Sequence, residues 1–302
     1  MSWLIIALAS SAFMGMVSIS DKVVIHKYCN TPLTLLLLIG ITQTTVGTVS
    51  LIFSGIPDEA TLATSGSAIG SGILSGLAAF LSQRVLYRQE VSRTIPITQS
   101  APIFTALLAL LILGESISII QWGGIIVAVL GCASISMSVD NENHGGVVMH
   151  NSFYVLMLSA FLFGASTVIG KVALESLPIL YTHGLRTITL GLLMLSFSLR
   201  PAPYNDVKSL INERSPAFLL VAVNDFVTAQ AGLIMMLWAL SIGPASLVGA
   251  VAGTRALFTV LYSIGISKIF IGALGEDIST GSVMVKLLST LLIVGGITAL
   301  AL

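Results

Sequence analysis

An arginine lies inside one of the most apolar stretches of the sequence. Arg255 is in the middle of "GAVAGTRALFTV", residues 249–260. Placing an arginine at the centre of a bilayer costs about 2.5 to 3.5 kcal/mol, so such a residue is usually retained for a function. A guanidinium group at this depth can bind a carboxylate or a similar anion, provided that a polar cavity or a protein partner shelters it.

The residues before Arg255 indicate where its helix lies. Ala245, Gly249 and Gly253 recur at every fourth position and form a stripe of small side chains. Such stripes allow close packing between helices in membranes. We therefore expect this segment inside a helix bundle, with Arg255 directed at a partner or a cavity.

Asp225 is the nearest acidic candidate for a partner of Arg255. It follows Asn224 in "VAVNDFVTAQAG", and a tight "SIGPAS" turn joins this segment to that of Arg255. At about 1.5 Å of rise per residue, the two depths differ by an amount that an extended arginine can bridge. Two interpretations stay open: an ion pair that only locks two helices together, or a pair that faces a cavity and also contacts a substrate.

Two further polar residues lie within apolar segments. Arg186 is well inside the stretch 180–199, and Gln99 lies between Pro96 and Pro102. Each proline removes a helical hydrogen bond, and the freed carbonyls are tolerated at membrane depth only against protein or water. The proline segment therefore predicts a kinked helix that lines a cavity. The candidate substrate-binding residues are Arg255, Asp225, Gln99, Asn224 and Arg186.

Other charged residues have a simpler interpretation. Asp21, Lys22, Arg84 and Lys171 lie nearer the ends of apolar segments, where a long basic side chain can extend to the membrane interface. We interpret these four as anchors. Glu115 follows a glycine between two apolar segments, which favours a capping role.

The composition requires a membrane protein. The chain has 302 residues, of which 55% are hydrophobic and 9% are charged, against about 25% charged residues in a soluble domain. A formal net charge of zero, without a basic face, argues against binding to nucleic acid.

Ten stretches are long enough to cross a bilayer as helices, which takes about 20 mainly apolar residues. The predicted spans are residues 3–25, 33–53, 67–88, 93–113, 117–138, 152–174, 180–199, 217–240, 245–267 and 283–301. The connections between them are predicted to be short, except for residues 139–151, 200–215 and the segment before the last span.

The two halves of the chain resemble each other. "SSAFMGMVSISDKVV" aligns without a gap with "SAFLFGASTVIGKVA", which places Gly15 on Gly164 and Lys22 on Lys171, both 149 residues apart. Such internal similarity is the mark of a duplicated architecture.

A second alignment at an offset of 154 places Phe104 on Phe258 and Thr105 on Thr259, and "LGES" has a counterpart in "LGED". We therefore predict an all-α integral membrane protein in which residues 1–138 form one five-helix repeat and residues 152–302 another. The linker is residues 139–151. An odd number of spans per repeat inverts the second copy in the membrane, a plan that is common among secondary transporters.

The charged loops bear on orientation. Most basic loop residues fall on one face of the predicted topology, which the positive-inside rule assigns to the cytoplasm, so both termini would lie outside. The residues on this face are Lys27, Arg84, Arg88, Arg93, Arg200, Lys208, Arg214 and Lys268.

Catalytic, metal-binding and ATP-binding motifs are absent from the sequence. The four histidines lack HExxH spacing, and no GxSxG, Walker A or GxGxxG segment occurs. Cys29 and Cys132 have the spacing of neither a zinc site nor a disulfide framework. We expect no enzyme activity, no metal and no cofactor.

The ten spans, the duplicated unit and the segment of residues 96–136 together resemble the EamA-like branch of the drug/metabolite transporter superfamily. That segment is similar to the family's proline-containing helix, Gly-Glu turn and glycine-rich fifth helix, and "SAFLFGASTVIGKVALES" is similar to its aromatic-glycine opening. The resemblance implies a basket-like bundle whose cavity is lined by spans one, three, four, six, eight and nine. It places Gln99, Asp225 and Arg255 around that cavity, and it implies cytoplasmic termini, opposite to the charge distribution.

We therefore predict a secondary transporter of small polar or anionic organic metabolites, such as amino or organic acids, in the inner cell membrane. Arg255 attracts the anion in this hypothesis, and Asp225 holds Arg255 or carries a coupling proton. The expected assembly is a monomer or a homodimer. One alternative is a lipid-linked carrier or flippase component. The other is a sugar-phosphate-type exchanger: Thr254-Arg255 resembles the Lys-Arg pair in the ninth helix of such relatives, with threonine in place of the lysine.

Overall fold

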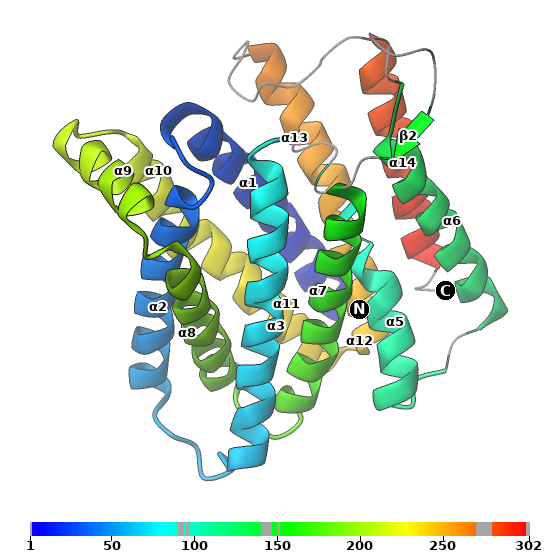
Figure 1. Ribbon diagram of the computed structural model, residues 1–302. Helices are drawn as coiled ribbons and strands as arrows, with labels where there is room; N and C mark the ends of the chain where they lie inside the picture. The colour runs from blue at the N-terminus through cyan, green and yellow to red at the C-terminus, as the bar shows by residue number, and fades with distance from the viewer. Residues whose placement is uncertain are drawn as a thin grey trace.

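The computed structural model describes residues 2–89, 94, 97–98, 100–116, 118–139, 147–149, 152–269 and 280–299. In these ranges the chain forms a bundle of helices and one short β-hairpin (Figure 1). The elements are α1 (Ser2–Tyr28), α2 (Thr34–Ser54), α3 (Leu62–Leu86), α5 (Ala101–Ile112), α6 (Ile119–Ser136), β1 (Met137–Val139), β2 (Val147–Met149), α7 (Ser152–Leu174), α8 (Ile179–Ser198), α9 (Pro201–Asn212), α10 (Ala217–Val223), η1 (Asn224–Thr228), α11 (Ala229–Ile242), α12 (Ala245–Ala252), α13 (Arg255–Ile269) and α14 (Thr280–Ala299).

Six helical stretches of the described residues are long and apolar enough to cross a membrane. They are α1, α2, α3, α7, the continuous stretch Ala217–Ile242, and Ala245–Ile266. They correspond to six of the ten predicted spans. The other four contain α5, α6, α8 and α14, for which crossing the membrane stays a prediction.

Two predicted connections contain secondary structure. Within 200–215 lies α9, whose Pro203, Asp206 and Leu210 are buried at helical spacing while the rest of the helix is more exposed. The linker 139–151 overlaps the antiparallel pairing of β1 with β2. The amphipathic pattern of α9 is short and has prolines at its first and third positions, so it did not predict a helix.

The eighth and ninth predicted spans are irregular. A π-helical turn, η1, separates α10 from α11 in the eighth. In the ninth, α12 ends at Ala252, and Gly253 and Thr254 form a turn before α13 begins at Arg255. The Thr254 hydroxyl donates to the carbonyl of Val251 at 2.7 Å, an alternative to regular helical bonding. The ninth predicted span is thus present as the apolar stretch Ala245–Ile266, and the turn at Gly253 and Thr254 inside it was not predicted.

Four glycines form a seam between α2 and α8, which lie side by side in Figure 1. Gly47 packs on Ile188 and Gly191 on Thr44, so closely that a methyl group on either glycine would overlap the partner's backbone. Gly40 and Gly184 make the equivalent contacts with Leu195 and Leu51, respectively. Higher residue numbers on α2 face lower ones on α8, so the two helices are antiparallel.

These seam contacts are reciprocal. Gly184 and Gly191 of α8 follow Gly40 and Gly47 of α2 by 144 residues. The contacted residues obey the same offset, since Leu195 and Ile188 of α8 follow Leu51 and Thr44 of α2 by 144 residues. A pair of antiparallel helices that exchange equivalent contacts is what a twofold pseudosymmetry axis produces when it passes between two copies of one helix. The α2–α8 seam therefore lies on such an axis.

The same reciprocity holds for the helices that the internal alignment matched. The Ser10 hydroxyl donates to the carbonyl of Gly232 at 2.7 Å, and that of Ser159 to the carbonyl of Ala78 at 2.8 Å. These pairs are related by the offsets of 149 and 154 that the sequence showed. Each repeat thus places its first helix against the other repeat.

The predicted alignment also matches a backbone contact. Gly15 packs on the Cβ of Phe258, and Gly164 on the Cβ of Phe104. A side chain at either glycine would meet its partner at 2.8 to 2.9 Å, closer than carbon atoms can approach.

The interpretation of Lys22 and Lys171 as interfacial anchors is wrong. The Lys22 amine donates to the carbonyls of Leu86 (2.9 Å) and Gln89 (2.6 Å), at the end of α3. The Lys171 amine donates to Leu240 (2.7 Å) and Gly243 (3.1 Å), at the end of α11. Both lysines occupy helix ends whose last carbonyls lack intrahelical partners. Arg84, in contrast, is exposed, with its guanidinium 5.4 Å from the ring centre of Phe80.

Candidate functional site

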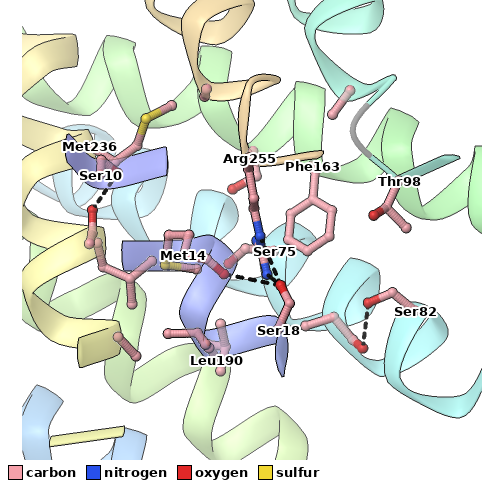
Figure 2. Close-up of a pocket in the computed structure, with 18 of the residues that line it drawn as sticks. Ser10, Met14, Ser18, Ser75, Ser82, Thr98, Phe163, Leu190, Met236 and Arg255 are labelled. Carbon is pink, nitrogen blue, oxygen red and sulfur yellow. Dashed lines mark hydrogen bonds between the residues drawn. The ribbon is translucent and has the colours of Figure 1, made fainter. Parts of the chain in front are cut away.

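A cavity of about 270 Å³ lies between helices of both halves. Serine and threonine side chains from α1, α3, α5, α7 and α8 line much of it, with apolar contacts from residues such as Met14, Phe163, Leu190 and Met236 (Figure 2). Its charged and larger polar lining residues are Asp21, Gln43, Gln83, His183, Arg186, Asp225 and Arg255.

Arg255 is the first residue of α13, and Figure 2 shows its side chain extending toward Ser18 of α1. Its Nε donates to the Ser18 Oγ at 3.1 Å and its Nη2 to the same atom at 2.6 Å. Asp21 lies one helical turn after Ser18, and its carboxylate attracts the guanidinium. Arg255 therefore connects the start of α13 to α1 at the cavity wall.

Asp225 has different partners from those predicted. Its Oδ2 accepts a hydrogen bond from the Thr42 hydroxyl at 2.9 Å, and its Oδ1 accepts one from the Asn224 amide at 3.1 Å. The described residues include no ion pair between Asp225 and Arg255. The two residues line one cavity from different walls because the turn at Gly253 and Thr254 directs Arg255 toward α1.

Asn224 joins two carboxylates. Its Nδ2 donates to Oδ1 of Asp21 at 3.0 Å as well as to Asp225, while Nε2 of Gln83 donates to the other Asp21 oxygen at 2.7 Å. All three residues of the Asp21–Asn224–Asp225 cluster are at least 95% buried. The side-chain oxygens of Asn224 and Gln83 are buried without a hydrogen-bond partner.

A glutamine supports the π-helical turn that presents Asn224 and Asp225. Gln230 Nε2 donates to the backbone carbonyl of Asp225 at 2.7 Å and to the Gln43 Oε1 at 3.1 Å, and its own Oε1 is 3.1 Å from the Nε2 of His183. A π-turn inserted in an α-helix often marks a functional site. Here the network fixes the turn to α2 and α8.

Arg186 lines the cavity from α8. Its Nη2 donates to the Ser166 hydroxyl at 3.3 Å, and its Nη1 lies against Gly170, where a methyl group would be 2.9 Å away. No carboxylate is a hydrogen-bond or ion-pair partner of Arg186 among the residues that the structure describes. A guanidinium group offers five N–H donors, so most of them are available to a ligand.

The structure thus brings Arg255, Asp225 and Arg186 to one cavity and places Asn224 directly behind it. Gln99 lies outside the described residues, although Thr98 and Pro102 near it line the cavity. The interpretation of Asp21 as an anchor is wrong, since Asp21 is 4% exposed and lines the cavity. A sequence signal for Asp21 existed: it follows Ser18 by about one helical turn in a segment that the internal alignment matches to the second half of the chain.

Comparison with known proteins decides the family. The model of the EamA-like transporter family matches residues 1–137 and 152–300. The chain belongs to this family. It is a multi-pass membrane transporter of the drug/metabolite transporter superfamily, built from two repeats.

Solved structures share the fold of this EamA-like transporter. Twenty-seven chains match, among them a crystal structure with a TM-score of 0.65 and 15% sequence identity that covers 99% of this chain and 96% of its own. At this identity the similarity establishes the fold alone. A comparison with the curated proteins gives no match.

Proposed function

We propose that this EamA-like protein is a secondary transporter of small polar or anionic organic solutes, such as organic or amino acids, and that the cavity is its binding site. The observation that carries the proposal is the position of two guanidinium groups, those of Arg186 and Arg255, in the wall of one cavity between the two halves. Buried cations inside a transporter bundle are costly, and ionisable residues at this depth mark substrate or ion pathways.

The size of the cavity supports a small solute. Drug-sized ligands occupy pockets of about 300 to 1,000 Å³, and this cavity of about 270 Å³ is smaller. Hydroxyl groups such as those of Ser11, Ser75 and Thr187 supply hydrogen bonds along its wall. A lipid-linked carrier would instead require an apolar surface that continues toward the bilayer.

Transport requires that the two ends of the bundle open in turn. One end carries an apolar cluster with Val24, Leu35 and Leu86, and the other a cluster with Leu240 and Val248. We propose that the two halves rock about the central site so that these clusters separate alternately, as in other inverted-repeat carriers. Asp225, next to Asp21, is the candidate for a coupling proton.

Uptake into proteoliposomes tests this function. Purified protein is reconstituted, and the entry of radiolabelled carboxylic acids and amino acids is measured against empty vesicles. Arg255→Ala is expected to lower uptake by about tenfold or more, since charge-assisted hydrogen bonds are worth about 1.5 to 3 kcal/mol. Arg200→Ala, at an exposed position before α9, is the matched control.

Two outcomes would contradict the proposal. The first is the absence of uptake of any solute in the panel by well-folded wild-type protein. The second is unchanged uptake after Arg255→Ala in protein whose melting temperature shows that it folds, which would remove Arg255 from the site.

A further inference from the structure

The pseudosymmetry axis relates two corners of the cavity. Asp21 contacts Asn224 in one corner, and its counterpart Gly170 lies against Ser71 in the other. The offset from Ser71 to Asn224 is 153 residues, whereas the offset from Ala78 to Gly232, after η1, is 154. The difference of one is expected, because a π-turn inserts one extra residue into the second of the two helices. The two contacts are therefore equivalent.

A second pair of contacts extends the equivalence. Thr42 donates to Asp225 in the first corner, and its counterpart Arg186, 144 residues later, lies against Gly72 in the second. Asp225 and Gly72 are related by the same offset of 153 as the previous pair. Each position of one corner thus has a counterpart in the other.

The two corners carry net charges of opposite sign. The acidic corner consists of Asp21, Thr42, Asn224 and Asp225, with two carboxylates. The basic corner consists of Gly170, Arg186, Ser71 and Gly72, with one guanidinium and no carboxylate. The missing side chain of Gly170 leaves the space that the Arg186 guanidinium fills, because a methyl group there would lie 2.9 Å from Nη1.

Arg255 does not cancel this polarity, because it belongs to the acidic corner. It hydrogen-bonds to Ser18 and interacts with Asp21, so one positive group faces two carboxylates there. Among the described residues, Asp225 receives hydrogen bonds only from neutral groups, those of Thr42 and Asn224. The acidic corner therefore has room for one more positive charge, and the basic corner for one negative charge.

The two corners lie toward opposite ends of the bundle. Pairs such as Ser71 with Ser166 and Ala78 with Ser159 show that α3 and α7 are antiparallel. Asp21 lies at the level of the end of α3, because the neighbouring Lys22 binds a carbonyl there. Gly170 lies near the end of α7, next to Lys171. Since α3 and α7 are antiparallel, these two ends are at opposite ends of the bundle. The charge separation therefore has a component along the length of the helices.

From this arrangement we propose that the transported solute is a small zwitterion, whose anionic group binds Arg186 in the basic corner and whose cationic group binds the carboxylates of Asp21 and Asp225. This inference rests on the proposed transport function and specifies its substrate class. Arg255 then acts on the solute through Asp21, because its charge-assisted hydrogen bonds to Ser18 hold α1 and the Asp21 carboxylate in place, and Arg255→Ala lowers uptake by displacing that carboxylate. Both charges of the solute are needed, because either one alone leaves a buried protein charge uncompensated.

Binding to purified protein tests the inference with defined probes. The probes are ω-amino acids from glycine to 6-aminohexanoate, the carboxylates that lack the amine, and the amines that lack the carboxylate. Ligand-induced increases in melting temperature give the affinities, since a bound ligand stabilises the folded state. A zwitterion of one length is expected to bind about tenfold or more tightly than its matched carboxylate and amine.

Charge variants then identify the corners. Arg186→Gln is expected to lower the affinity for the zwitterion to that for the matched amine. Asp225→Asn is expected to lower the affinity for the zwitterion to that for the matched carboxylate. Gly170→Ala is the second test of the basic corner, because it displaces the guanidinium and keeps its charge; it should weaken the zwitterion and leave amine binding unchanged. Lys208→Gln on the exposed face of α9 is the control.

The results separate this inference from the general function. The inference is overturned if carboxylates bind as tightly as zwitterions. It is also overturned if neither Arg186→Gln nor Gly170→Ala changes the binding of zwitterions. Either result can occur while Arg255-dependent uptake of carboxylates supports the transport function. Failure of uptake for every solute, with intact binding of zwitterions, contradicts the transport function and leaves the charged corners supported.

Discussion

Glu115 binds the first turn of α12 around Ser246 with both of its carboxylate oxygens. Its Oε1 accepts from the Ala245 amide at 3.1 Å, and its Oε2 accepts from the Ser246 amide at 3.2 Å and from the Ser246 hydroxyl. The sequence predicted a capping role for Glu115, and the structure shows that the capped helix is in the other half of the chain. The first-turn amides of a helix have no intrahelical partners and favour a negative group.

Glu115→Gln is expected to lower the free energy of unfolding by about 1 kcal/mol, and Glu115→Ala by more, because the amides of α12 then lose their acceptor. Thermal unfolding in detergent measures the effect. Glu213→Gln, an exposed residue after α9, should leave the melting temperature unchanged. Equal melting temperatures for the Glu115 variants and wild type would show that this contact contributes nothing.

Lys171→Met should destabilise the protein by about 1.5 to 3 kcal/mol, since it removes a charged donor from two helix-end carbonyls. Lys22→Met should have a similar effect at the other end of the bundle. Lys208→Met is the exposed control. If Lys171→Met and Lys22→Met unfold at the same temperature as the wild type and the Lys208→Met control, the helix-end contacts are not stabilising.

Gly47→Ala is expected to cost about 1 to 3 kcal/mol, because the new methyl group overlaps the backbone of Ile188. Gly66→Ala provides the matched control, since no atom lies within 4 Å of the added carbon and alanine is the better helix former by about 1 kcal/mol. Comparison of the two melting temperatures should give changes of opposite sign. A Gly66→Ala protein less stable than Gly47→Ala would contradict the packing of the seam.

Cys29 follows α1 and packs against the apolar cluster at that end of the bundle. Burial, together with the negative charge of Asp206, raises the pKa of its thiol to about 12. Because the thiolate is the reactive form, maleimide labelling of a Cys132→Ser protein should be slow at neutral pH and should accelerate as the pH rises toward 12. Rapid labelling at pH 7, equal to that of unfolded protein, would show that the thiol is exposed.

The sequence predicted the features that depend on local pattern. The apolar segments gave the positions of α1, α2, α3 and α7, and the alignment of Gly15 with Gly164 identified helices that make equivalent contacts. Arg186 and Arg255 were recognised because a charge within an apolar segment is costly wherever the helix packs. The repeat boundaries at residues 138 and 152 stay predictions.

The pairing of side chains was not predictable in the same way. The expected contact between Arg255 and Asp225 assumed two straight helices, whereas the turn at Gly253 and Thr254 directs Arg255 to α1. Asp21 was misassigned because its distance from the helix end along the chain says nothing about which helices cover it. Its burial comes from Gln83 and Asn224, which are distant in sequence.

The glycine seam of α2 and α8 determines which parts of the molecule can move. Where backbones touch without side chains between them, sliding by even a fraction of a helical turn would produce collisions. This pair is therefore expected to act as a fixed fulcrum during a transport cycle, while the helices that bear Lys22 and Lys171 swing about it.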